Sequence, residues 1–252
     1  MEPVIGLDFG TTNSAIAVAD NDRLATLATF ADGSTTTTSF RSILYFPAKE
    51  RYSQKKIETQ AGPEAINSYL DADTKGRLIV SIKSYLASPL FTSTSINGRN
   101  YTLEDLIAII LRRLRTAAMQ QFGTSASQVV LGRPVRFAGA ENDAGEQLAL
   151  QRLQKAAELA GFERISFELE PVAAAYQYET QLDHDELVLI GDFGGGTSDF
   201  TFARLGPGRK KAGVNPVIGT SGVAIAGDTF DSRIMMRLVA PKLGHGSHQF
   251  FR

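Results

Sequence analysis

Two short glycine-rich stretches carry the residue types that could bind phosphate. The chain reads IGLDFGTTNSA over residues 5–15 and LIGDFGGGTSD over residues 189–199. In each stretch an apolar strand ends in an aspartate and is followed by glycine and threonine. Glycines let backbone N–H groups converge on one point, and such concave arrangements bind anions. The threonine hydroxyl adds a hydrogen bond, and a carboxylate supplies the hard oxygen that Mg²⁺ prefers. Together, the two glycine-rich stretches therefore predict a site that binds phosphate and magnesium.

Two glycine-rich hairpin turns with incidental threonines are the simpler alternative. Repetition of the whole pattern, from the apolar strand through the aspartate to the threonine, favours the phosphate interpretation. Neither a G-x-x-x-x-G-K-[ST] loop nor a helix-opening G-x-G-x-x-G is present. Because the glycines lie between two strands, we expect neither a P-loop nor a Rossmann fold.

Composition narrows the class of protein. The 252 residues carry a formal net charge of -1, so nothing global favours nucleic acid or an anionic membrane as a partner. Cysteine is absent, which excludes disulfides and Cys-ligated metals. No basic leader and no run of eighteen apolar residues occurs, so we expect a cytoplasmic protein without a signal peptide or membrane span.

Strands and helices alternate around the first motif. Thr102 with Asp105 resembles a capping box, and apolar residues at helical spacing follow until Gly123. Gly161 would end a second long helix, and Pro171 would open a short one. The expected strands are 4–9, 14–19, 23–30, 128–133 and 165–169, the expected helices are 63–70, 80–86, 102–122 and 143–160, residues 32–39 are expected to be a loop, and Asn97-Gly98 is expected to turn a hairpin.

The second motif begins the same succession again. Strands are expected at 186–193, 200–205 and 216–224, with a loop at 194–199, a glycine- and lysine-rich turn at 206–215 and a helix from residue 227. An internal repeat of this kind indicates two related lobes. The first unit takes about 180 residues, and only 66 remain for the second. We therefore expect a first lobe over 1–184 and the start of an incomplete second lobe over 185–252, in an N-terminal piece of a longer protein.

The ordered blocks resemble a known family. IGLDFGTTNSAIAV, FELEPVAAAYQY, IGDFGGGTSDFTF and AGDTFDSRIM are similar to the signatures of the seventy-kilodalton heat-shock chaperones of the DnaK type. GRPV and MMRLVAPKLGHGS resemble, more narrowly, the divergent YegD-type chaperones. The resemblance runs from residue 4 to about 247. It implies an α/β fold of the actin-like ATPase class, with duplicated ribonuclease H-like lobes.

The resemblance also implies roles for individual residues. Asp8 and Asp192 would hold Mg²⁺ through its water shell. Lys83 would reach the γ-phosphate, and Glu170 and Asp199 would surround the attacking water. The residues implied to contact the nucleotide are Gly10, Thr11, Thr12, Asn13, Gly194, Gly195, Gly196, Thr197 and Gly227, with Thr197 also near the γ-phosphate. Pro134 and Pro171 resemble the elements that couple nucleotide state to lobe closure.

Each role has a plainer alternative. Lys83 could be a solvated lysine, Glu170 could be a carboxylate favoured at a helix start, and Asp199 could pair with Arg204. The sequence also departs from the family, which usually has two glycines where this chain has Ala226-Gly227. A methyl group at Ala226 could crowd the ribose or the β-phosphate.

The implied activity is slow ATP hydrolysis by a chaperone ATPase, with ATP or ADP and Mg²⁺ as cofactors and K⁺ as an open question. Unfolded peptide or a co-chaperone would bind through parts outside this chain. Most of the adenosine pocket would also lie outside it, so we expect weak ATP binding and weak or no activity by the isolated chain. A sugar kinase and an actin-like filament protein remain alternatives. The first would need a catalytic aspartate and a sugar pocket, and the second would polymerise with nucleotide.

Overall fold

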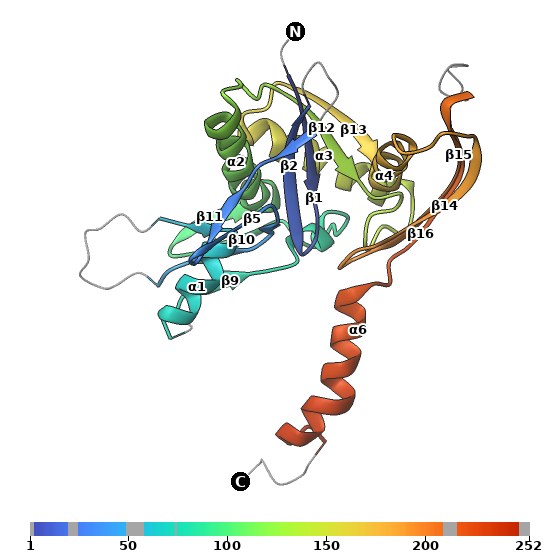
Figure 1. Ribbon diagram of the computed structural model, residues 1–252. Coiled ribbons are helices and arrows are strands. Elements are labelled where there is room, and N and C mark those ends of the chain that lie inside the picture. Colours follow the sequence, from blue (N-terminus) through green and yellow to red (C-terminus); the bar gives the residue numbers. More distant parts are fainter. Residues whose placement is uncertain (1–2, 20–24, 49–57, 74, 209–215, 247–252) are drawn as a thin grey trace, which may run out of the picture.

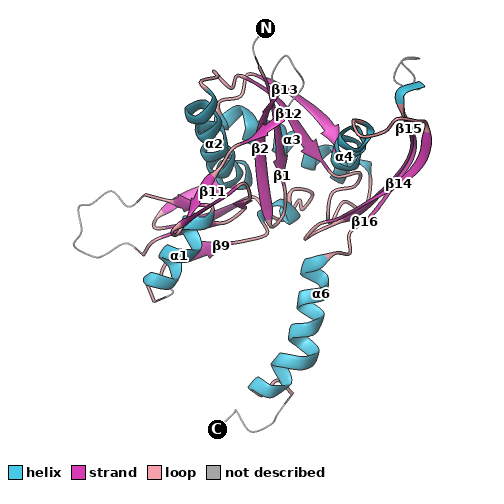
Figure 2. Ribbon diagram, in the orientation of Figure 1, coloured by secondary structure: helices cyan, strands magenta, loops and turns pink. Residues whose placement is uncertain are grey.

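The computed structural model describes residues 3–19, 25–48, 58–73, 75–208 and 216–246. It is a mixed α/β structure, in line with the expected fold class (Figures 1 and 2). The helices are α1 (Pro63–Asp71), α2 (Leu103–Phe122), α3 (Asp143–Ala160), α4 (Glu170–Glu179) and α6 (Gly227–Ile234), with short turns η1 (Ile82–Tyr85), η2 (Met235–Val239) and η3 (Ala240–Leu243). The strands of the first half are β1 (Val4–Phe9), β2 (Asn13–Ala19), β3 (Ala25–Leu27), β4 (Phe30–Asp32), β5 (Thr35–Thr37), β6 (Phe40–Arg41), β7 (Leu44–Phe46), β8 (Gln60–Ala61), β9 (Arg77–Ile79), β10 (Ser93–Ile96) and β11 (Arg99–Thr102). Those of the second half are β12 (Gln128–Arg133), β13 (Arg164–Leu169), β14 (Glu186–Phe193), β15 (Ser198–Leu205) and β16 (Val217–Val223).

The main sheet has the strand order β13-β12-β1-β2-β3, and β6 pairs with the end of β2. The strands β1, β2 and β3 form the expected antiparallel meander, whereas β12 and β13 join β1 in parallel. Parallel strands need long crossovers, and α2 and α3 lie in these connections. The order brings the carboxyl ends of β1, β12 and β13 to one edge of the sheet.

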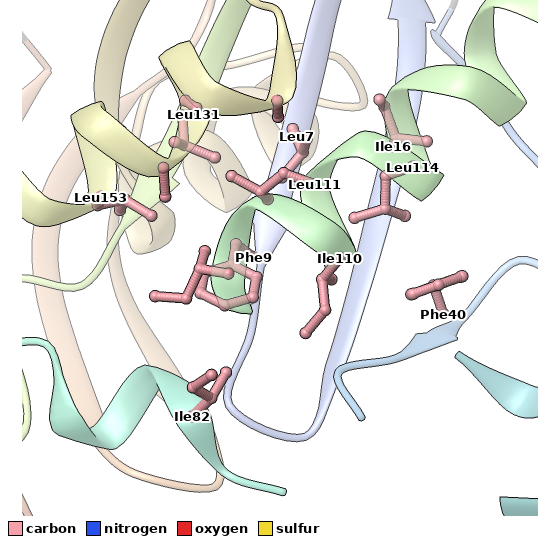
Figure 3. Packing of buried hydrophobic residues seen from close by; sticks show 14 of the residues in the cluster. Leu7, Phe9, Ile16, Phe40, Ile82, Ile110, Leu111, Leu114, Leu131 and Leu153 are labelled. Atoms are coloured by element: carbon pink, nitrogen blue, oxygen red, sulfur yellow. The ribbon is translucent and has the colours of Figure 1, made fainter. Parts of the chain in front are cut away.

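Alternation along β1 separates the core from the site. Ile5, Leu7 and Phe9 are almost completely buried in one hydrophobic core. Leu7 and Phe9 face residues of α2 and α3 (Figure 3). Because successive side chains point to opposite faces of a strand, Gly6 and Asp8 lie on the other face. The core thus fixes β1 in register while leaving its last carboxylate available.

Local signals fix the two long helices as expected. Thr102 accepts from the backbone N–H of Asp105, whose carboxylate accepts from that of Thr102, so the capping box is complete. Gly123 and Gly161 end α2 and α3 in the left-handed conformation. Asn142 caps α3 through the N–H of Gly145, a signal that the sequence analysis did not use.

A second sheet, β14-β15-β16, is antiparallel throughout and stands beside the first (Figure 1). Its strands agree with the expected ones. Helix α4 contacts β12 and β13 on one side and β14 and β15 on the other, so it joins the two sheets. Helix α6 and the turns after it extend away from both sheets, and none of their described side chains is buried (Figure 2).

One local expectation was wrong. The polar stretch 32–39 was expected to be a loop, but part of it is a hairpin in which β4 pairs with β5 across Gly33, whose φ is 59°. The short helical piece expected around residues 80–86 is present as the 3₁₀ turn η1, which begins after Ser81 because the left-handed backbone of that residue (φ 53°) cannot belong to the helix. The expected turn at 206–215 lies mostly outside the described residues. No helix within the described ranges is long and apolar enough to cross a membrane.

Candidate functional site

The first glycine-rich loop is a tight connection between β1 and β2. A methyl group on Gly10 would collide with the backbone oxygen of Asn13, so only glycine fits this corner. The buried Ser42 holds the loop from behind, because its hydroxyl donates to Gly10 O at 2.7 Å and its N–H donates to Thr12 O at 2.9 Å. These two hydrogen bonds therefore hold the loop in a defined conformation.

The second glycine-rich loop joins β14 to β15. Gly194 N–H donates to Thr197 O at 2.9 Å and closes the turn. The first residues of α6 bind the outside of this loop, since Gly227 N–H donates to Gly194 O at 3.2 Å and Asp228 N–H donates to Gly195 O at 2.9 Å. This loop is thus supported by an element that follows it by about thirty residues.

The two loops face each other at van der Waals distance. A methyl group built on Gly195 would lie 2.6 Å from Thr12 Oγ1, and one on Gly196 would lie 3.1 Å from Thr11 Oγ1. Such approaches are closer than carbon atoms normally make to a neighbour, so glycine is needed for the two hairpins to meet. Residues more than 180 positions apart in the sequence, Thr11 and Thr12 on one loop and Gly195 and Gly196 on the other, thereby form the two sides of one site.

A cavity of ≈ 360 Å³ lies between the loops. Its walls contain every residue expected at the site except Asp199: Asp8, Gly10, Thr11, Thr12, Asn13, Lys83, Glu170, Asp192, Gly194, Gly195, Gly196, Thr197 and Gly227. Three further residues line it that the sequence analysis did not place there, namely Phe193, Asp228 and Asp231. Asp228 and Asp231 are three residues apart on α6, so they lie on one face of the helix. This spacing is the feature of the sequence that could have identified them as site residues.

Lys83 reaches the cavity from η1 and makes an ion pair with Glu170. The Nζ–Oε1 distance is 2.6 Å, and Lys83 is only 8% exposed, so it is not the solvated lysine of the plainer alternative. Glu170 occupies the first turn of α4, where the helix dipole favours a negative charge. Gly132 makes room for it, since a methyl group there would lie 3.2 Å from Glu170 Cγ.

Acidic groups outnumber the cation that faces them. Burial, followed by the nearby charge of Glu170, raises the pKa of Asp8 to about 6, although Lys83 opposes this. Burial raises the pKa of Asp192 too, with the charge of Glu170 as the second cause. The side chain of Asp8 opens into the cavity, so water there limits the energetic cost of its charge. The described residues of the cavity wall therefore carry more negative than positive charge, and this favours the binding of a cation.

Asp199 lies behind the second loop rather than in the cavity wall. It is 1% exposed, and burial raises its pKa although Thr197 and the backbone N–H of Arg136 hydrogen-bond to it. Among the described residues no ion pair joins it to Arg204, the partner in the alternative interpretation, and one carboxylate oxygen has no hydrogen-bond partner. Asp199 can hold the loop through Thr197 but does not line the cavity.

The departure at Ala226 does not place a methyl group in the site. Ala226 is 1% exposed and precedes α6 in an extended conformation, while the neighbouring Gly227 lines the cavity. The expected crowding of the cavity by this methyl group is therefore not seen.

The donor set suits a hydrated Mg²⁺ with phosphate better than a metal bound by protein alone. No group of three or more His, Cys, Asp or Glu residues in the described part of the chain could hold a metal ion directly. Mg²⁺ usually keeps several waters and uses one or two carboxylates together with substrate phosphates. Asp8 and Asp192, with their raised pKa values, fit that arrangement.

A larger cavity of ≈ 740 Å³ adjoins the site on the α4 side. It shares Asp8, Glu170 and Asp192 with the smaller one, but alanine, leucine, valine and glycine make up most of its wall. A polyanion needs N–H groups, hydroxyls and cations, and of these two cavities the smaller one has the threonines, the glycine-rich loops and Lys83 in its wall.

Comparison with known families agrees with the geometry. The model of the Hsp70 protein family matches residues 4–242. The chain belongs to the Hsp70 family. Hsp70 domains are nucleotide-binding ATPase domains of chaperones, so the family expected from the four sequence blocks is confirmed, and the α/β fold accords with it. The narrower YegD-type assignment and the cytoplasmic location stay predictions.

The raised pKa of Asp8 predicts how stability depends on pH. The folded chain holds a proton on Asp8 that the unfolded chain has released between about pH 4 and 6, so the ionised group disfavours folding above that window. Asp8→Asn is expected to raise stability modestly at pH 7.5 and to leave it unchanged at pH 4, as measured by urea unfolding. The exposed Asp32→Asn serves as the charge-matched control. A loss of stability in Asp8→Asn at pH 7.5 would contradict the prediction.

The contact between the loops predicts a difference between neighbouring glycines. Gly195→Ala forces the hairpins apart, so we expect Mg-tripolyphosphate affinity to fall at least about tenfold by calorimetry. Gly194→Ala is the matched control, because its methyl group would meet only Thr197 O at 3.4 Å, an ordinary contact. Equal affinities of the two variants would show that the loops need not meet.

Proposed function

We propose that this chain forms part of an Mg-ATP site between two lobes of an actin-like fold, and that the full-length protein, in which we expect the tests below to be made, hydrolyses ATP slowly as a DnaK-type chaperone. The first lobe would comprise residues 1–184 and the second would begin at 185. The observation that carries the proposal is the Lys83–Glu170 ion pair, which closes the end of a cavity whose sides are the two glycine-rich loops.

The loops would hold the phosphates. Backbone N–H groups of residues 10–13 and 195–197 would donate to phosphate oxygens, and the hydroxyls of Thr11 and Thr12 would add hydrogen bonds. Asp8 and Asp192 would hold the water shell of Mg²⁺, which when bound offsets charge on the β- and γ-phosphates. Asp228 and Asp231, also in the cavity wall, would face the same metal water shell from α6.

Hydrolysis would depend on the ion pair. Phosphoryl transfer needs positioning and charge compensation more than covalent help. Lys83 would place a positive charge beside the γ-phosphate, and Glu170 would accept a hydrogen bond from the attacking water and orient it. Asp199 would act indirectly by holding Thr197.

Chaperone function fits this site better than the two alternatives. Water as the acceptor accords with an acidic group already paired to a lysine, whereas a sugar kinase needs an aspartate free to deprotonate a hydroxyl. Filament formation stays a prediction that pelleting with ATP would test. We propose that peptide and co-chaperones bind through segments outside this chain.

Substitution of Lys83 tests the proposal. We expect Lys83→Ala to lower single-turnover ATP hydrolysis by at least about a hundredfold, a loss typical of a removed electrostatic contact in the transition state. The Kd for Mg-ATP should change by less than about fivefold, since the loops remain. Lys155→Ala, an exposed lysine of α3, is the control.

Loss of one partner from a largely buried ion pair can also destabilise the fold, by about 3–5 kcal/mol. The double variant Lys83→Ala, Glu170→Gln removes both charges and separates this effect from catalysis. Unchanged turnover in a folded Lys83→Ala variant would contradict the role of Lys83, and a wild-type chain without any Mg-ATP binding would contradict the proposal.

A further inference from the structure

One arginine of α3 organises the loop that follows η1. Arg152 donates from Nη1 to Ser88 O at 2.8 Å and to Leu86 O at 3.1 Å, and from Nη2 to Phe91 O at 2.9 Å. The carbonyl oxygen of Tyr85 lies 3.4 Å from the same Nη1. Four carbonyl groups within seven residues therefore converge on a single guanidinium group.

The guanidinium group is itself held in place. Its Nε lies 3.4 Å from Glu104 Oε1, and the side chains of Arg152 and Glu104 are only 12% and 21% exposed. Glu104 belongs to the first turn of α2, between the two residues of the capping box. Arg152 thus ties the loop to both long helices.

The clamped loop is the continuation of the turn that carries Lys83. A single 3₁₀ turn has poor hydrogen-bond geometry and little stability of its own. Its last carbonyl groups are bonded to the segment that follows, since Lys83 O accepts from Leu86 N–H and Tyr85 O accepts from Ser88 N–H. Arg152 fixes that following segment with charge-assisted bonds. Leu86 connects the two features, since its N–H donates to Lys83 O at 3.2 Å while its own carbonyl accepts from Arg152.

The other end of η1 offers no comparable support. Ser81 precedes it in a left-handed conformation that is unfavourable for a residue other than glycine, and its side chain makes no capping bond. Ile82 and Leu86 anchor the turn in the core, but apolar contacts do not fix the rotation of the turn about its own axis. Arg152 supplies directional bonds at the end where they are needed.

We propose that Arg152 is the positioning residue for Lys83: by capping the turn Ile82–Tyr85 it holds the Lys83 ammonium group against Glu170 at the end of the phosphate cavity. Arg152 is absent from the cavity wall, so it acts through Lys83 and not on the nucleotide. The inference rests on the proposed function for its effect on hydrolysis, but its effect on the ion pair does not depend on turnover.

The first test observes Lys83 directly in the full chain. The ¹⁵Nζ ammonium resonance of Lys83, assigned by its absence in Lys83→Ala, should be protected from solvent exchange by the 2.6 Å contact with Glu170. We expect Arg152→Met, which keeps an unbranched apolar stem but removes the guanidinium donors, to abolish this protection. Lys155→Met on the same helix should retain it. An unchanged Lys83 resonance in Arg152→Met would overturn the inference.

The second test is a double-mutant cycle on hydrolysis. Arg152→Met should lower single-turnover hydrolysis by at least about tenfold while the Kd for Mg-ATP changes by less than about threefold, because displacing a reacting group by about 1 Å is enough for such a loss. In the Lys83→Ala background the same substitution should cause no further loss. An equal loss in both backgrounds would assign Arg152 a general structural role and overturn the inference.

The conservative variant Arg152→Lys provides a second comparison that is less disruptive to folding than Arg152→Met. Arg152→Lys keeps the charge but lacks the planar fork, so we expect partial protection of Lys83 and partial hydrolysis. If Arg152→Met does not fold, Arg152→Lys carries both comparisons. Unchanged hydrolysis in Lys83→Ala would count against the proposed function alone, since the resonance of Lys83 still decides the role of Arg152.

Discussion

The site depends on an imbalance of charge at the meeting point of two sheets. Asp8, Glu170 and Asp192 approach one lysine, and burial makes their negative charges costly, as the raised pKa values of Asp8 and Asp192 show. A fold tolerates such a cluster when a bound cation and polyanion complete it. Both glycine-rich loops line the same cavity, and we propose that their backbone N–H groups bind that polyanion.

The scaffold serves to hold these groups in fixed positions. Strand β1 is locked by its buried face against α2 and α3, and this leaves Asp8 at the end of the strand on the opposite face. Helix α4 joins the two sheets and begins with Glu170, so the same element sets the spacing of the sheets and the position of the carboxylate. Lys83 is the exception, because a short turn carries it, and its position depends on contacts from elsewhere.

The sequence predicted most of the features that depend on interactions between residues close together in the chain. The cap at Thr102, the glycines that end α2 and α3, and the alternation in β1 are properties of a few neighbouring residues, and each agrees with the structure. The site loops were also found from sequence, since repetition of the motif compensated for the weakness of each copy. The Hsp70 family match covers the same blocks.

What sequence did not predict depends on contacts between distant segments. Whether Lys83 is solvated or paired depends on α4, which lies 87 residues further on. Asp199 carries the right residue type but does not line the cavity, whereas Asp228 lines it because the start of α6 hydrogen-bonds to Gly195. The role of Arg152 is equally invisible in sequence, where it is one basic residue on an amphipathic helix.

The central claim is that both hairpins bind one polyanion together, and backbone amide spectra test it most directly. Titration of the ¹⁵N-labelled chain with Mg-tripolyphosphate separates phosphate binding from recognition of adenosine. The account predicts that the amides of residues 10–13 and 194–197 shift together along one binding curve. Shifts confined to one hairpin, or two hairpins that respond with different affinities, would contradict it.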